Sequence, residues 1–260
     1  MNYNLNNKNA IVCGGTDGIG KAIAISLANN GCNIILIARN QNKLDNTIKE
    51  LNGEDKHHTL CVDFNNPKEL KEKINTLLTS LKISIDILIN NSGGPKGGSL
   101  IEAEEDEFRI AFDRLLICNH ILAKAVVPGM ISLKSGRIIN IISTSINQVI
   151  PGLGVSNTIR GSVSQWAKTL ALELGEFGIT VNNILPGYTE TGRLKELALN
   201  KSKNLGVDEQ EVFDSWINNT AVKRLGLPEE IAASVTFLAS DAAAYINGHN
   251  LSIDGGRFGA

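Results

Sequence analysis

Short apolar runs alternate along the chain with longer segments whose apolar residues recur at spacings of three and four. The short runs are rich in β-branched residues and are bounded by Gly, Pro, Asn or Asp, which is typical of strands buried on both faces. Strands are predicted at Ala10–Cys13, Asn33–Ile37, His58–Val62, Ile85–Asn90, Arg137–Ile142, Thr180–Ile184 and Asn250–Ile253. The intervening segments have helical periodicity. Strands that alternate with helices in this way indicate an α/β fold with a parallel sheet.

Two of the predicted helices, over residues 104–130 and 155–177, are longer than the rest. Long helices beside the central strands often supply subunit interfaces in folds of this type. No internal stretch resembles a linker, and 260 residues suffice for one large core, so residues 1–260 are interpreted as one domain.

Composition narrows the choice of partner. Hydrophobic residues make up 42% and charged residues 20% of the chain, as in globular proteins. A net charge of −2 argues against a nucleic-acid or anionic-membrane partner, because both need a basic surface. A small-molecule partner is expected instead. The first residues do not resemble a secretory signal, and no apolar run reaches the length of a membrane span, so a cytoplasmic location is expected.

The four cysteines are scattered, with no CxxC motif. This pattern predicts neither a zinc site nor a disulfide framework.

A glycine-rich loop, Gly14–Gly20 (GGTDGIG), joins the first predicted strand to the first predicted helix. In a dinucleotide site Gly14 would allow the tight turn, Gly18 would let the backbone approach a pyrophosphate, and Gly20 would let helix and strand pack closely. The helix N-terminus would offer free N–H groups to the phosphates. A plain turn is the alternative, but the strand before the loop and the helix after it favour the dinucleotide site.

Four motifs carry a family resemblance. They are the glycine loop, Asn90-Asn91-Ser92-Gly93, Asn182–Gly187 (NNILPG) and Ser252–Gly256 (SIDGG). In order and spacing they resemble the motifs of the short-chain dehydrogenase/reductase family, over nearly the whole chain. The resemblance implies one doubly wound Rossmann-type domain, with a seven-stranded parallel sheet and helices on both faces. It also implies a nicotinamide cofactor, a carbonyl or alcohol substrate, and assembly as a homotetramer or homodimer.

The end of the second strand bears on the choice of cofactor. It reads Ile37-Ala38-Arg39-Asn40, without the acid that would bind a ribose 2′-hydroxyl. Arg39 instead favours NADP, because a guanidinium can bind a 2′-phosphate with two donors. An ordinary surface arginine is the alternative. Asp17 points toward NAD, since many NADP-binding relatives carry a basic residue at this place, and NAD therefore stays possible.

The resemblance assigns further cofactor contacts. Asp63 matches a position that bonds the adenine, and Thr189 and Thr191 match positions that hold the nicotinamide carboxamide. A turn-forming aspartate and helix-capping threonines are the alternatives. The implied cofactor site consists of Gly14, Thr16, Asp17, Gly18, Ile19, Gly20, Arg39, Asp63, Asn90, Ser92, Gly93, Arg160, Pro186, Gly187, Thr189 and Thr191.

The catalytic positions depart from the family pattern. The family uses a tyrosine as acid, a lysine four residues later, a serine that polarises the carbonyl, and an asparagine in a proton relay. Ser143 matches the serine, with a plain turn as the alternative, but Ser156 takes the place of the tyrosine and Arg160 that of the lysine. Leu115 falls at the asparagine. An alkyl hydroxyl is a far weaker acid than a phenol, and arginine does not pass protons, so this relay is broken as usually drawn.

Other polar and aromatic residues offer weaker candidates. Tyr188 is either a replacement proton donor or an aromatic that lines the substrate cleft. Asn119 and His120 are interpreted as structural. Surface positions are expected for His57, His58 and His249.

Residues 191–222 are polar and amphipathic and match the family's mobile substrate lid. Two functions stay open. One is an NAD(P)(H)-dependent oxidoreductase with an altered catalytic group, Ser143, Ser156 and Arg160. The other is a dinucleotide-binding protein without turnover, either a sensor or an inactive partner subunit. The retained serine at 143 and the retained cation at 160 favour the enzyme.

Overall fold

The computed structural model describes residues 3–53 and 56–258. Its strands form one parallel sheet in the order β3-β2-β1-β4-β5-β6-β7. The strands are β1 (Asn9–Cys13), β2 (Asn33–Ala38), β3 (His58–Cys61), β4 (Ile87–Asn90), β5 (Gly136–Ile141), β6 (Ile179–Pro186) and β7 (Asn250–Ile253). The predicted seven-stranded α/β fold is confirmed. The first and last residues of each predicted strand lie within two residues of those of an observed strand.

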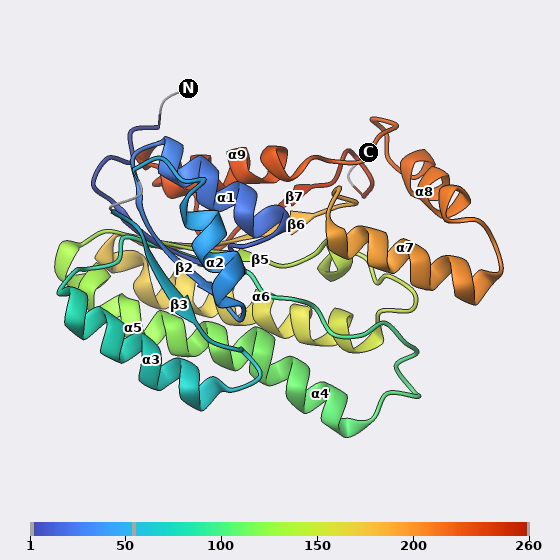
Figure 1. Ribbon diagram of the computed structural model, residues 1–260, viewed down its shortest axis with the longest axis horizontal. Coiled ribbons are helices and arrows are strands. Elements are labelled where there is room, and N and C mark those ends of the chain that lie inside the picture. Colours follow the sequence, from blue (N-terminus) through green and yellow to red (C-terminus); the bar gives the residue numbers. More distant parts are fainter. Residues whose placement is uncertain (1–2, 54–55, 259–260) are drawn as a thin grey trace.

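Helices cover both faces of the sheet. Their bounds are α1 (Gly18–Asn29), α2 (Gln41–Ile48), α3 (Pro67–Leu81), α4 (Glu105–Phe112), α5 (Cys118–Leu133), α6 (Gly154–Leu174), α7 (Gly192–Leu205), α8 (Glu209–Asn218) and α9 (Pro228–Ala239). Helices α1, α2 and α9 lie on one face, and α3, α5 and α6 lie on the other (Figure 1). Helices α7 and α8 extend beyond the sheet on the side where α6 begins.

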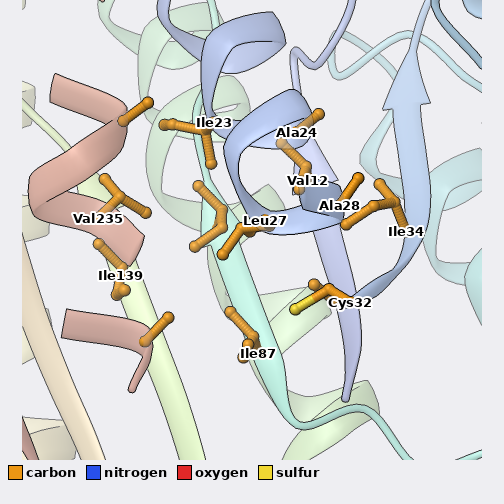
Figure 2. Close-up of a cluster of buried hydrophobic side chains, with 14 of the residues drawn as sticks. Val12, Ile23, Ala24, Leu27, Ala28, Cys32, Ile34, Ile87, Ile139 and Val235 are labelled. Atoms are coloured by element: carbon orange, nitrogen blue, oxygen red, sulfur yellow. The ribbon is translucent and has the colours of Figure 1, made fainter. Parts of the chain in front are cut away.

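The core explains why the strands are apolar at successive positions. Side chains of a strand alternate between the two faces, so a strand covered on both faces needs apolar residues throughout. In β1, Ala10 and Val12 pack toward α1 and α9, while Ile11 and Cys13 pack on the opposite face. Figure 2 shows the first of these layers, where Val12 lies among side chains of α1, α9 and the central strands.

The predicted helix over residues 104–130 is continuous in direction but not in hydrogen bonding. A π-helical turn, η2 (Asp113–Ile117), separates α4 from α5. Such turns insert one extra residue and often lie at functional sites. The combined helix, Glu105–Leu133, is long and apolar enough by length and composition to cross a membrane. Its residues Cys118, Leu122 and Met130 are fully buried against the sheet.

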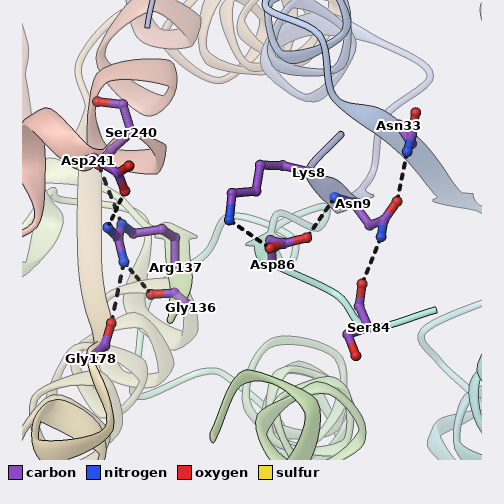
Figure 3. Close-up of polar contacts among 10 residues, drawn as sticks. All are labelled: Lys8, Asn9, Asn33, Ser84, Asp86, Gly136, Arg137, Gly178, Ser240 and Asp241. Atoms are coloured by element: carbon purple, nitrogen blue, oxygen red, sulfur yellow. Dashed lines mark hydrogen bonds and ion pairs between the residues drawn. The ribbon is translucent and has the colours of Figure 1, made fainter. Parts of the chain in front are cut away.

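Polar contacts fix the strands at their amino ends (Figure 3). Lys8 Nζ lies 3.0 Å from Asp86 Oδ1, and the backbone N–H of Asn9 donates to the other carboxylate oxygen at 2.9 Å. The Asn9 side chain donates to Ser84 O and accepts from Asn33 Nδ2, both at 2.9 Å. These contacts tie β1 to β2 and to the entry of β4. They involve only the amino ends of the strands, so the carboxyl ends at the opposite edge of the sheet take no part in them.

One sequence expectation is wrong in this region. The expected surface position of His57 does not hold, because this residue is only 8% exposed. Its Nδ1 accepts from the backbone N–H of Ile34 at 3.0 Å, and Nε2 lies 2.9 Å from Asn52 O. Burial lowers the pKa of this imidazole, so the neutral ring holds the start of β2.

Candidate active site

A pocket of about 380 Å³ opens at the carboxyl ends of the central strands. It lies where the strand order reverses between β1 and β4, the place at which open α/β sheets bind ligands. Predicted site residues that line it are Gly14, Asp17, Gly18, Ile19, Gly20, Ser92, Gly93, Ser143, Ser156, Arg160, Pro186 and Thr191. The fold therefore brings together segments that are far apart in the sequence.

The glycine loop needs its glycines for steric reasons. Gly14 has a φ of +58°, and a Cβ there would lie 2.8 Å from Asn91 Nδ2. A Cβ on Gly20 would lie 2.1 Å from the carbonyl oxygen of Gly14. Helix α1 thus begins in direct contact with the loop, and its first residues, Gly18, Ile19 and Gly20, line the pocket. This arrangement fits a dinucleotide pyrophosphate, as predicted.

Asp17 has a structural role at the same helix end. Its Oδ1 accepts from the Gly18 N–H at 2.8 Å, which makes it the N-cap of α1. Its Oδ2 lies 3.8 Å from Lys43 Nζ, so a cation faces the carboxylate. Arg39 is exposed just after β2 and has no hydrogen bond or ion pair with the described residues. The charge of Asp17 is therefore partly balanced, and Arg39 is available for an anionic ligand.

Some predicted cofactor residues lie outside the lining of the pocket, namely Thr16, Arg39, Asp63, Asn90, Gly187 and Thr189. Asp63 accepts from the Asn65 N–H at 2.9 Å, the geometry of the turn that was its alternative. Thr189 is buried and donates to the carbonyl of Gly187. Thr191 caps α7, as its alternative interpretation expects, and it also lines the pocket, while its carboxamide contact stays a prediction.

Ser156 and Arg160 form one hydrogen-bonded unit on the first turns of α6. Arg160 Nε donates to Ser156 Oγ at 3.2 Å, because residues four apart share a helix face. Arg160 Nη1 donates to the carbonyls of Ile141 and Ile142 at the end of β5. The helix and the strand end together fix the guanidinium beside the pocket.

Ser143 completes this group from the other side. It follows β5, and its Oγ accepts from the Ser145 N–H at 3.1 Å. The hydroxyl proton is not used by this contact and can be donated to a ligand. Ser143 therefore both forms the turn and lines the pocket.

Arg160 is half-buried and has no carboxylate partner among the described residues. Burial, and then the nearby charge of Arg193, lower the pKa of Arg160 to about 10. The guanidinium is still charged at neutral pH. The pocket thus contains a fixed cation whose counter-charge must come from solvent or a ligand.

Sequence comparison decides the family. The profile of the family described as Enoyl-(Acyl carrier protein) reductase matches residues 14–257. The 3-oxoacyl-[acyl-carrier-protein] reductase of Vibrio cholerae is 34% identical over 257 residues, which cover 98% of this chain and 99% of the relative. This chain belongs to the short-chain dehydrogenase/reductase family. Dehydrogenase/reductase SDR family member 4 of Bos taurus is 33% identical, with 97% and 88% of the two chains covered.

Solved structures agree with this assignment. L-sorbose reductase from Gluconobacter frateurii, complexed with NADPH and L-sorbose, superposes with a TM-score of 0.92 at 28% identity over the full length of both chains. A variant of actinorhodin polyketide ketoreductase with NADPH gives a TM-score of 0.89 at 28% identity, with 98% of each chain covered.

Tyr188 of this short-chain dehydrogenase/reductase does not line the pocket. Its ring stacks on Trp216 of α8, with ring centroids 5.1 Å apart and an interplanar angle of 16°. The Arg257 guanidinium lies 4.0 Å from the centre of the Tyr188 ring. Burial raises the pKa of the phenol. In this structure the Tyr188 ring joins α8 to the body of the protein, and its two sequence interpretations stay predictions.

Several lining residues were not predicted: Asn91, Gly94, Pro95, Ile141, Ile142, Leu153, Gly192, Arg193 and Leu197. Arg193 matters most, because its Nη2 donates to the Pro95 carbonyl at 3.1 Å across the pocket mouth. Its Nη1 lies 2.8 Å from Glu196. The available signal was its place two residues after Thr191, at the start of the predicted lid.

Proposed function

We propose that this short-chain dehydrogenase/reductase is an NADP(H)-dependent oxidoreductase that interconverts a small-molecule carbonyl and an alcohol at an altered catalytic group. One observation carries the proposal: Ser143 and the hydrogen-bonded pair of Ser156 and Arg160 line the same pocket as the glycine loop. A polar group able to act on an oxygen atom thus lies beside a surface built for a dinucleotide.

NADP is the proposed cofactor. Arg39 is exposed and unpaired within the described chain, and Lys43, 3.8 Å from the Asp17 carboxylate, offsets the negative charge beside the glycine loop. Relatives of the same fold are described with bound NADPH. The glycine loop would hold the pyrophosphate, Arg39 the 2′-phosphate and Arg160 the nicotinamide ribose. When bound, the cofactor supplies the hydride.

The side chains supply polarisation and charge. Ser143 and Ser156 each accept one hydrogen bond through Oγ, so both hydroxyl protons can be donated to a substrate oxygen. The Arg160 charge stabilises negative charge that develops on that oxygen. Serine is a weak acid, so the proton must come from water through the hydroxyl groups. Relative to a positioned phenol, a rate lower by about 10²- to 10⁴-fold is expected.

Residues 191–222 are proposed to cover the bound substrate. Helices α7 and α8 share a small apolar cluster of their own, which includes Leu194, Val212 and Trp216. The segment contacts the β4 loop through Arg193 and Pro95. Two helices that pack on each other can move as one piece to admit substrate.

A homodimer or homotetramer in the cytoplasm is proposed as the working form. The two long helices expose apolar side chains, which include Ile110 and Phe112 on α4 and Leu172 on α6. Exposed apolar residues on such helices support a subunit interface.

The test is direct. Calorimetry should show NADPH binding more tightly than NADH, and a panel of aldehydes and ketones should include one that oxidises NADPH with the purified protein. The Ser143→Ala variant should bind NADPH unchanged and lose turnover. Tight NADPH binding with no turnover across the panel would instead support the dinucleotide-binding protein without turnover. Failure to bind either cofactor would contradict both functions.

A further inference from the structure

A ladder of asparagine side chains, three of them buried and one half-buried, crosses four strands of the sheet. Asn90 of β4 pairs in register with Asn140 of β5, Asn140 with Asn183 of β6, and Asn183 with Asn250 of β7. Each side-chain Nδ2 donates to the next Oδ1, at 2.8, 2.9 and 2.7 Å in that order. Because the four asparagines are paired directly across neighbouring strands, their amides lie on one face of the sheet, the face that α5 and α6 cover.

The ladder has a direction. Every amide donates toward β7, so the aligned amide dipoles leave their acceptor end at Asn90, and aligned hydrogen bonds strengthen one another. Asn90 is 2% exposed, and its Oδ1 has no hydrogen-bond partner. Buried polar atoms are almost always paired, so this atom calls for a donor that the protein itself does not supply.

A small cavity adjoins this end of the ladder. Its polar lining residues are Asn90, Ser92, Asn119 and Arg160, and Leu115 is among the apolar ones. The space open to the centre of a water molecule is about 10 Å³, which is close to what one ordered water needs. A buried water needs two to four hydrogen-bond partners, and the polar residues that line the cavity can supply them.

Asn119 also borders this cavity. It is 6% exposed on α5, one helical turn after Leu115, and no described residue hydrogen-bonds its side-chain amide. Arg160 is bonded through Nε and Nη1 only, so its Nη2 lacks an acceptor among the described residues. Three unused polar groups therefore border one water-sized space.

We propose that the cavity holds one ordered water that donates to Asn90 Oδ1 and connects the amide of Asn119 to Arg160. Asn119 is then a positioning residue, which acts through this water to hold the guanidinium against Ser156. Its effect on turnover rests on the proposed function, but the water site does not.

The first test is a crystal structure of the free protein, at a resolution that shows ordered water. Density is expected in the cavity within about 3.2 Å of Asn90 Oδ1. An empty cavity in well-ordered density would overturn the proposal. This outcome does not depend on cofactor or substrate, so it is distinct from failure of the proposed function.

The second test uses Asn119→Leu, which fills the space and removes the amide, and Asn119→Ser, which keeps a polar group and room for water. NMR of the arginine side chains should show faster solvent exchange of the Arg160 Nε–H in Asn119→Leu. NADPH affinity and any kcat should fall by about 10- to 100-fold, as expected when a reacting group is misplaced. Asn119→Ser should stay near the native values.

Val126→Ala serves as a control, because Val126 is buried on α5 away from the cavity. It should lower stability without changing Arg160 exchange. Native exchange and NADPH affinity in folded Asn119→Leu would refute the positioning role. If Asn119→Leu and Val126→Ala changed Arg160 exchange and NADPH affinity equally, Asn119 would act only through packing of the helix, and the positioning role would be refuted as well.

Discussion

Replacing Gly20 by alanine sets two physical effects against each other. Gly20 lies inside α1, where alanine would normally stabilise a helix by about 1 kcal/mol. The new Cβ would, however, lie 2.1 Å from the Gly14 carbonyl oxygen and 2.6 Å from Asn91 Nδ2. Relief of these contacts requires backbone of the glycine loop to move by about 1 Å, and such overpacking typically costs about 1–3 kcal/mol. A net loss of stability is expected, together with weaker cofactor binding.

Gly161→Ala is the matched control. Gly161 also lies inside a helix, α6, but a Cβ there would meet nothing within 4 Å. This variant should therefore gain stability, with Tm rising by about 2–4 °C per kcal/mol, while Gly20→Ala should lose it.

Thermal unfolding and NADPH calorimetry of the two variants measure both effects. The expected pattern is lower Tm and weaker NADPH binding in Gly20→Ala, against higher Tm and native binding in Gly161→Ala. If Gly20→Ala were as stable as Gly161→Ala, or bound NADPH with native affinity, the close contact between helix and loop would not be what requires glycine at this position.

The other predictions concern the pocket and one buried histidine. The double variant Ser156→Tyr/Arg160→Lys should raise reductase kcat by about 10²-fold or more, because it restores a tunable phenol, and no gain would count against the proposed geometry. Arg39→Ala should weaken NADPH binding by about 10- to 100-fold and leave NADH unchanged, and equal losses would contradict a 2′-phosphate contact. Arg193→Ala should raise KM by about 2- to 10-fold with a smaller change in kcat, because it releases the lid contact. Burial lowers the pKa of His57 below its ordinary 6.5, so unfolding takes up a proton and stability should fall as pH drops below that value. His57→Asn should show less of this fall in urea titrations at several pH values, and an unchanged pH dependence would rule the histidine out as its source.

The sequence by itself determined the strands, the glycine loop and the candidate catalytic positions. Strands buried on both faces must be apolar at successive positions, so their places along the chain can be read from the pattern alone. Gly14, Gly18 and Gly20 are recognisable because a tight turn between strand and helix needs them at fixed spacing. Ser156 and Arg160 share a helix face by spacing, and the structure places them in one hydrogen-bonded unit.

Only the tertiary structure decided which polar groups meet across large sequence separations. Asn90 and Asn140 are 50 residues apart, and strand register alone puts their amides in contact. The chain pattern likewise gave no sign that His57 would be buried under β2 or that Tyr188 would stack on Trp216 of α8. Spacing along the chain predicts which residues share a face of one helix or strand. Packing between helices and strands determines which residues of other elements they contact, and the hydrogen bonds of buried polar groups depend on those contacts.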